Sequence, residues 1–138
     1  MKTFHKILLI AILYGFAAAG ENEPVNPPVK AELIAEETSI QPGRSFWVGI
    51  HLMMNDPYHT YWKNPGDSGL PTEIEWTLPA GFKAGPIQWP YPSRFQSESE
   101  VTFGYSDSVV LLTMITSFES LDTTEVTLQA RVNWLACS

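Results

Sequence analysis

Alternation of apolar and polar positions is the dominant pattern from residue 29 onward. It is clearest in the segments 46–54, 72–78 and 126–134, and weaker in 29–36. A period of two is typical of strands with one buried face, whereas residues 109–115 are apolar on both faces, which predicts a central strand. The side chains expected to face the core are Phe46, Val48, Ile50, Leu52, Ile74, Trp76, Leu78, Val126, Leu128, Ala130, Val132 and Trp134.

Turn-forming residues separate these segments. They cluster at 41–43, 64–69, 79–81 and 106–108, and the 11 prolines are spread along the chain. No window of a dozen residues has an apolar stripe with helical spacing. The pattern therefore predicts an all-β chain, folded as an immunoglobulin-like antiparallel β-sandwich.

The first 20 residues have the three parts of a secretory signal peptide. Lys2 and Lys6 are basic, the run from Ile7 to Phe16 is apolar, and the small residues Ala17 to Gly20 form a cleavage site. The apolar run is shorter than the roughly 20 residues that span a bilayer, although an uncleaved membrane anchor is the alternative. We expect export, with a signal peptide at 1–20 and a flexible acidic, proline-rich leader at 21–28.

Removal of residues 1–20 leaves 118 residues, enough for one domain. This part has 6 basic and 15 acidic residues, a net charge of −9. Such a charge argues against nucleic acid as a partner, because binding to nucleic acid depends on neutralising phosphates. No nucleophile–base pair, paired carboxylates or phosphate-binding glycine loop is present, and we expect no metal and no cofactor.

The chain has one cysteine, Cys137. A lone cysteine in an exported protein either pairs with another molecule or has its partner outside the sequence. The sequence stops within an apolar strand pattern, so we interpret residues 29–138 as a C-terminally incomplete domain. The alternative is that Cys137 is an inert, buried small side chain.

Several motifs resemble one known family, the N-terminal domain of DsbD-type thiol:disulfide interchange proteins, and in particular its ScsB-like branch. The resemblance covers residues 29–138 and is strongest in the block 59–71. The matching motifs are Val29–Glu36, Ile40–Gly43, His59–Pro71, Gln88–Pro92, Arg94–Phe95, Phe103–Tyr105 and Asn133–Cys137.

The resemblance implies a periplasmic electron-transfer module of a protein-disulfide reductase, tethered to the inner membrane in a longer protein. Its expected partners are a transmembrane domain and a thioredoxin-like domain of the same protein. Its expected acceptors are exported thioredoxin-fold proteins, including those of cytochrome c maturation. Cys137 matches the first redox cysteine of the family, and the second has no counterpart here.

The resemblance also suggests roles for aromatic residues. An aromatic cap shields the redox cysteines in the family, and Phe103 and Tyr105, or Phe95, are the candidates, with core packing as the alternative. Tyr61, Trp62 and Leu135 are candidates for a partner surface, although the loop that carries the first two is also explained by structure alone. Continued alternation beyond Trp134 places Cys137 on the outward face of its strand.

Two other classes of function stay open. His51, Met53 and His59, with Met54, are soft ligands of the kind that binds Cu(I), so a non-enzymatic copper-handling module is one alternative. The residues show no His-x-His or Met-x-x-Met cluster, which favours packing roles. The other alternative is an immunoglobulin-like interaction domain in which Cys137 is incidental.

Overall fold

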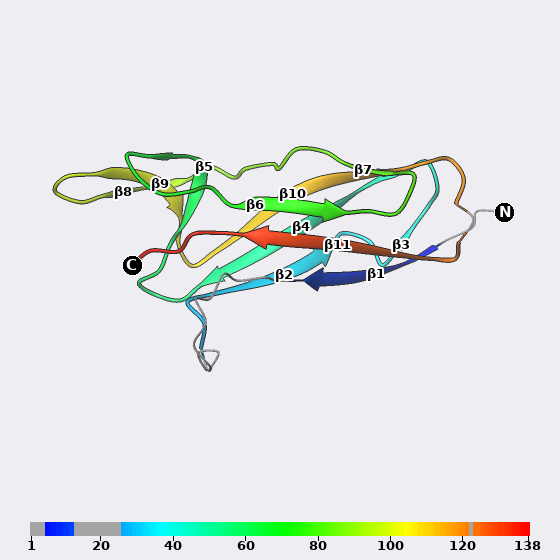
Figure 1. Cartoon of the computed structure of the whole chain (residues 1–138), viewed down its shortest axis with the longest axis horizontal. Coiled ribbons are helices and arrows are strands. Elements are labelled where there is room, and N and C mark those ends of the chain that lie inside the picture. Colours follow the sequence, from blue (N-terminus) through cyan, green and yellow to red (C-terminus); the bar gives the residue numbers. More distant parts are fainter. Residues whose placement is uncertain (1–4, 13–25, 122) are drawn as a thin grey trace.

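The computed structural model describes residues 5–12, 26–121 and 123–138. Every regular element in these residues is a β-strand, which confirms the all-β prediction. The part of the chain that is described contains no helix long and apolar enough to cross a membrane. Two four-stranded sheets pack as a sandwich, and a smaller three-stranded sheet lies at one end (Figure 1).

The first large sheet has the order β3-β1-β11-β6. Its strands are Ser39–Ile40, His5–Ile12, Glu125–Asn133 and Glu73–Thr77, respectively. The second large sheet has the order β2-β4-β10-β7. Its strands are Val29–Ala35, Ser45–Met54, Ser108–Ser117 and Phe82–Ala84. Pairing is antiparallel except between β1 and β11. The immunoglobulin-like sandwich is thus confirmed.

The core lies between the two large sheets. The expected inward positions of β4 and β11 are buried, including Ile50 and Leu128 with no exposed surface. Full burial of one such aliphatic side chain contributes about 1.5–3 kcal/mol. One cluster of core residues contains Leu52, Leu111 and Val132, and the half-buried Trp134 and Ala136 pack against it. This cluster supports the chain end that leads to Cys137.

Part of the expected signal peptide forms strand β1. It runs parallel to β11, from Lys6 opposite Glu125 to Ile12 opposite Arg131. Ile7 and Leu9 pack against the second core cluster. The expected cleavage site at 17–20 lies outside the described residues, so signal processing stays a prediction.

The expected leader at 21–28 is only partly described. Residues 21–25 lie outside the described residues. At the other end, the Asn55 side chain donates to the Pro27 carbonyl at 2.8 Å, and the Asn55 N–H donates to the Pro28 carbonyl at 2.9 Å. These bonds fix the chain just before β2.

The small sheet has the order β5-β9-β8. Its strands are Thr60–Gly66, Val101–Tyr105 and Ser93–Gln96. The hairpin of β8 and β9 extends beyond the sandwich at the end where the C-terminus lies (Figure 1). The small sheet therefore stands beside the last residues of the chain.

Candidate functional site

Cys137 is held in place by a backbone bridge to His59. The His59 N–H donates to the Cys137 carbonyl at 2.9 Å, and the Cys137 N–H donates to the His59 carbonyl at 3.1 Å. Strand β11 ends at Asn133, so the alternation that placed Cys137 on an outward strand face does not extend to it. The free thiol belongs to a half-buried residue next to the small sheet.

The Tyr61 hydroxyl lies beside the Cys137 side chain. Burial first, and then the interaction with Cys137, raise the pKa of Tyr61 to about 12. The hydroxyl therefore stays protonated at neutral pH and can donate to the sulfur.

The Tyr61 ring packs closely against Gly69. Gly69 has a φ of +105°, and a Cβ there would collide with the Tyr61 ring. The turn at 64–69 is tied to the small sheet as well: the Asp67 carboxylate accepts from the Val101 N–H at 2.8 Å, and the Ser68 hydroxyl donates to Glu100 at 2.8 Å. These bonds hold Gly69 against the Tyr61 ring.

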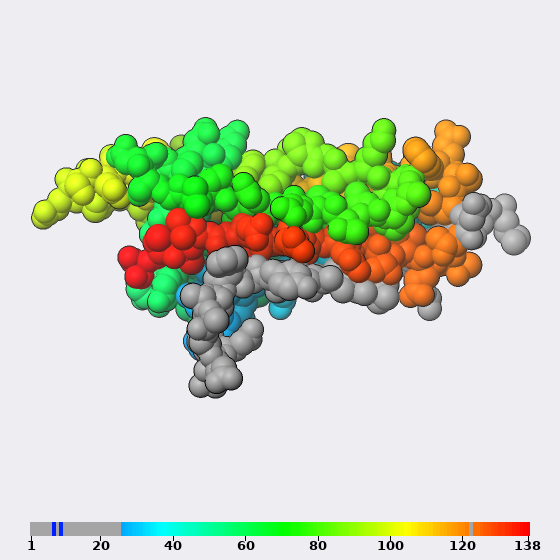
Figure 2. All heavy atoms as spheres, in the orientation of Figure 1, coloured from blue at the N-terminus to red at the C-terminus, as the bar shows by residue number. Residues whose placement is uncertain are grey.

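A hollow of about 360 Å³ opens beside Cys137. Residues from β5, the 64–69 turn, the β8–β9 hairpin and the chain end line it: His59, Tyr61, Ser68, Phe95, Gln96, Ser97, Glu100, Thr102, Cys137 and Ser138. Figure 2 shows the C-terminal residues, in red, at the surface beside the green segment that contains β5. The hollow thus gives a second molecule a place to approach the thiol.

Of the three residues expected to cap the cysteine, Phe95 lies in this hollow. Its ring stacks on His59, with ring centres 4.6 Å apart and an interplanar angle of 24°. Phe103 instead meets Trp62 edge-on at 6.4 Å. Tyr105 is buried in the core and donates its hydroxyl to the Pro90 carbonyl at 2.8 Å. The structure therefore does not bring Phe103 and Tyr105 to Cys137, because they lie on the face of β9 opposite Thr102, which lines the hollow.

Gly104 explains this strand path. It lies within β9, opposite Tyr61. A Cβ at Gly104 would collide with the Thr60 carbonyl. The glycine therefore allows β9 and β5 to approach closely, and it does not form a cap.

The expected partner surface is only partly exposed. Tyr61 is 4% exposed, so it lines the hollow and presents little surface. Trp62 is half-buried against the core, with the Lys63 Nζ 5.3 Å from its ring centre. Leu135 is half-buried. Sequence analysis missed Leu70, which directly follows Gly69 and is 65% exposed.

The soft ligands considered for copper lie on different surfaces. His51 and Met53 are on the outward face of β4, where the His51 Nε2 makes a 2.9 Å hydrogen bond with the Ser108 hydroxyl. Met54 is buried in the core. The contacts described for His59 are with Tyr61, Phe95 and Cys137. Within the described residues, no group of three or more His, Cys, Asp or Glu side chains could hold a metal ion.

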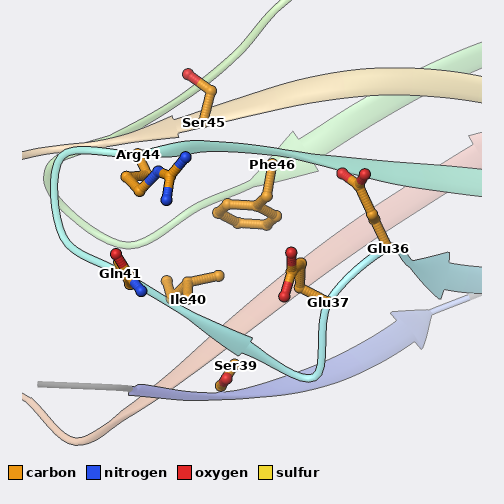
Figure 3. Close-up of a pocket in the computed structure, with 8 residues that line it drawn as sticks. All are labelled: Glu36, Glu37, Ser39, Ile40, Gln41, Arg44, Ser45 and Phe46. Atoms are coloured by element: carbon orange, nitrogen blue, oxygen red, sulfur yellow. The ribbon is translucent and has the colours of Figure 1, made fainter. Parts of the chain in front are cut away.

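A separate hollow of about 240 Å³ lies near β3. Figure 3 shows Glu36, Glu37 and Arg44 around the ring of Phe46. None of the residues expected to carry chemistry lines it. The site at Cys137 is therefore the candidate functional site.

The comparisons with known proteins agree with this geometry. The family model "Thiol:disulfide interchange protein DsbD, N-terminal" matches residues 30–138. A search of the curated proteins finds no match. The solved N-terminal periplasmic domain of ScsB from Proteus mirabilis superposes with a TM-score of 0.61 at 24% identity. That match covers 85% of this chain and 43% of the solved chain, and it supports the fold.

The matched residues include every residue that lines the hollow, from His59 to Ser138. Because the family model spans most of the chain, the resemblance inferred from the motifs is confirmed. The chain belongs to the family of the N-terminal domain of the thiol:disulfide interchange protein DsbD.

Proposed function

We propose that this domain exchanges thiols and disulfides through Cys137 in the periplasm. The observation that carries the proposal is the contact of Cys137 with the Tyr61 hydroxyl at the edge of a hollow that a second molecule can enter. A thiolate is the attacking species in such exchange. Family membership supports the same chemistry.

The reaction is a displacement at sulfur. The Cys137 thiolate attacks one sulfur of a partner disulfide, a new S–S bond forms, and the other sulfur leaves as a thiolate that takes up a proton. A second thiol then displaces Cys137 and releases the product. The 138 residues contain one cysteine, so that second thiol lies outside them.

The partners follow from the family and are part of the proposal. A transmembrane domain and a thioredoxin-like domain of a longer protein supply the electrons, and exported thioredoxin-fold proteins, including those of cytochrome c maturation, accept them. Export through residues 1–20 and a tether to the inner membrane complete this assignment. The solved ScsB domain is described as periplasmic, which supports the location.

Oxidised glutathione tests the exchange step directly. The folded chain should form a mixed disulfide with one glutathione, detected by intact-mass spectrometry and reversed by reductant. The Cys137→Ser variant should form none. If the adduct appears only after unfolding in urea, the thiol is a core group and the proposal fails.

A thioredoxin-fold protein that lacks its resolving cysteine tests the choice of partner. The attacking cysteine of that protein should form a disulfide with Cys137 that is visible on a non-reducing gel. A glutathione adduct without this complex would retain the exchange chemistry and overturn the assigned class of partner.

A further inference from the structure

His59 and Cys137 lie directly opposite each other in an antiparallel bridge. Directly opposed residues in such a pair project their side chains from the same face. Tyr61 shares this face, because it follows His59 by two positions in an extended segment. The imidazole therefore emerges beside the thiol.

The imidazole also contacts the hairpin that overlies the hollow. It stacks on Phe95 of β8, and the ring of Tyr61 meets it edge-on at 5.1 Å and 69°. Strand β8 is the outer strand of the small sheet and pairs with β9 on one side. The described ring contact that joins β8 to the segment paired with Cys137 is the stack of Phe95 on His59.

We propose that His59 is a positioning residue of the exchange site, whose uncharged imidazole holds Phe95 and strand β8 at the wall of the hollow beside the Cys137 thiol and releases them on protonation. This inference rests on the proposed function, and it adds a control of access to it. Phe95 and Cys137 line the same hollow, so the hairpin narrows the approach of a partner to the thiol while the His59–Phe95 stack is formed. We call this arrangement the covered state.

The direction of the pH effect follows from burial. Burial lowers the pKa of His59 from its ordinary value of 6.5. The covered state therefore binds a proton less readily than the open state, in which the imidazole is hydrated. A fall in pH through 6.5 consequently favours the open state.

Other charged groups around the hollow act on the same imidazole. Glu100, a Cys137 thiolate and, in the 138-residue chain, the terminal carboxylate of Ser138 each favour the imidazolium. Tyr61 stays protonated in this pH range because its pKa is about 12. Burial lowers the pKa of His59 in the covered state, so its effect on this pKa is larger than that of these charges.

Alkylation of Cys137 by iodoacetamide measures the cover. The rate is measured from pH 5 to pH 8 in the 138-residue chain, and each folded rate is divided by the rate of the same variant unfolded in urea, which removes the intrinsic pH dependence of the thiol. His59→Phe keeps a stacking ring that cannot titrate, and His59→Ala removes the stack. His51→Phe is the matched control, since His51 bonds Ser108 on the outward face of β4.

We expect the normalised rate of the parent to rise several-fold relative to His59→Phe as the pH falls from 7 to 5. His59→Ala should be several-fold faster than the parent at pH 8, and its hairpin amides at 93–105 should exchange hydrogen faster. His51→Phe should follow the parent. A parent-to-His59→Phe ratio that stays flat with pH, or a His59→Ala rate equal to that of the parent, would overturn the inference.

The glutathione experiment separates this result from the proposed function. If the mixed disulfide forms but neither its rate nor the alkylation rate depends on His59, the chain exchanges thiols and the control of access by His59 is wrong. If the alkylation rate depends on His59 but no mixed disulfide forms, the thiol is covered but does not take part in exchange. The proposed function is then wrong.

Discussion

Gly69 lies against the face of the Tyr61 ring, and this contact connects the 64–69 turn to the thiol of Cys137. The turn is anchored to β9 through Asp67 and Glu100, so it cannot easily move away. An aromatic ring packed this closely against a backbone has little freedom. The position of the hydroxyl therefore depends on the absence of a side chain at residue 69.

Substitution Gly69→Ala should slow the reaction of Cys137. The new Cβ would push the Tyr61 ring off the sulfur, and the φ of +105° is strained for alanine as well. Without the Tyr61 hydroxyl beside the sulfur, we expect alkylation at pH 7.5 to slow several-fold. Tyr61→Phe, which removes only the hydroxyl, should slow it to a similar extent.

The double variant gives the control for this prediction. If Gly69 acts through the Tyr61 hydroxyl, Gly69→Ala adds little to Tyr61→Phe, because both remove the same interaction. Effects that multiply in the double variant would contradict the connection. Far-UV circular dichroism shows whether each chain remains folded.

Leu70 should contribute to partner binding. It is 65% exposed and follows Gly69, so it stands on the surface next to the hollow. Leu70→Ser should reduce the rate of mixed-disulfide formation with a thioredoxin-fold protein, while leaving alkylation by iodoacetamide unchanged. Phe118→Ser is the matched control, because Phe118 is 60% exposed and lies beyond the end of β10, away from Cys137. Equal losses in both variants would indicate a general surface effect.

The large strands were predictable because burial on one face leaves a period of two in the sequence. Strands β4 and β11 follow it, and their inward residues are buried. Strand β10 was predicted instead from its apolar residues on both faces. Strand β8 left no such pattern, since Ser93–Gln96 has one apolar residue. Strand β1 was hidden for another reason: the same apolar run satisfies the requirements of a signal peptide.

Only those residues of the site that belong to local sequence motifs could be predicted from the sequence. Cys137 and the block around Tyr61 stand out as motifs. The pairing of His59 with Cys137 joins positions far apart in the chain, and no local pattern encodes it. His59 was therefore weighed as a metal ligand alone. The alternation that turned Cys137 outward failed because the chain leaves its strand at Asn133.

The domain should lose stability in alkaline solution through Tyr105. Burial raises the pKa of Tyr105 to about 12, whereas a tyrosine in the unfolded chain ionises near 10. Between these values the unfolded chain loses a proton that the folded chain keeps, so the free energy of unfolding falls as the pH rises. Urea unfolding at pH 8, 10 and 11 measures this fall.

Tyr105→Phe should reduce this alkaline slope. It also removes the hydrogen bond to the Pro90 carbonyl, so we expect a loss of about 0.5–1.5 kcal/mol already at pH 8. Tyr91→Phe is the control, because that ring is 97% exposed and should leave both quantities unchanged. An unchanged slope in Tyr105→Phe would contradict the assignment.

Removal of residues 1–20, the expected result of signal processing, should change the edge of β11. Strand β1 covers that edge from Glu125 to Arg131, and Ile7 and Leu9 pack on the core. Loss of these two half-buried side chains should lower the free energy of unfolding by about 1.5–3 kcal/mol. The uncovered edge should also pair with other chains, which sedimentation would detect as dimers at high concentration.

The double variant Ile7→Ala, Leu9→Ala in the full chain isolates the packing contribution, because it leaves the backbone of β1 in place. It should lose stability without forming dimers. If the shortened chain unfolds at the same urea concentration as the full chain and stays monomeric, β1 contributes nothing to the fold, and the edge of β11 needs no cover.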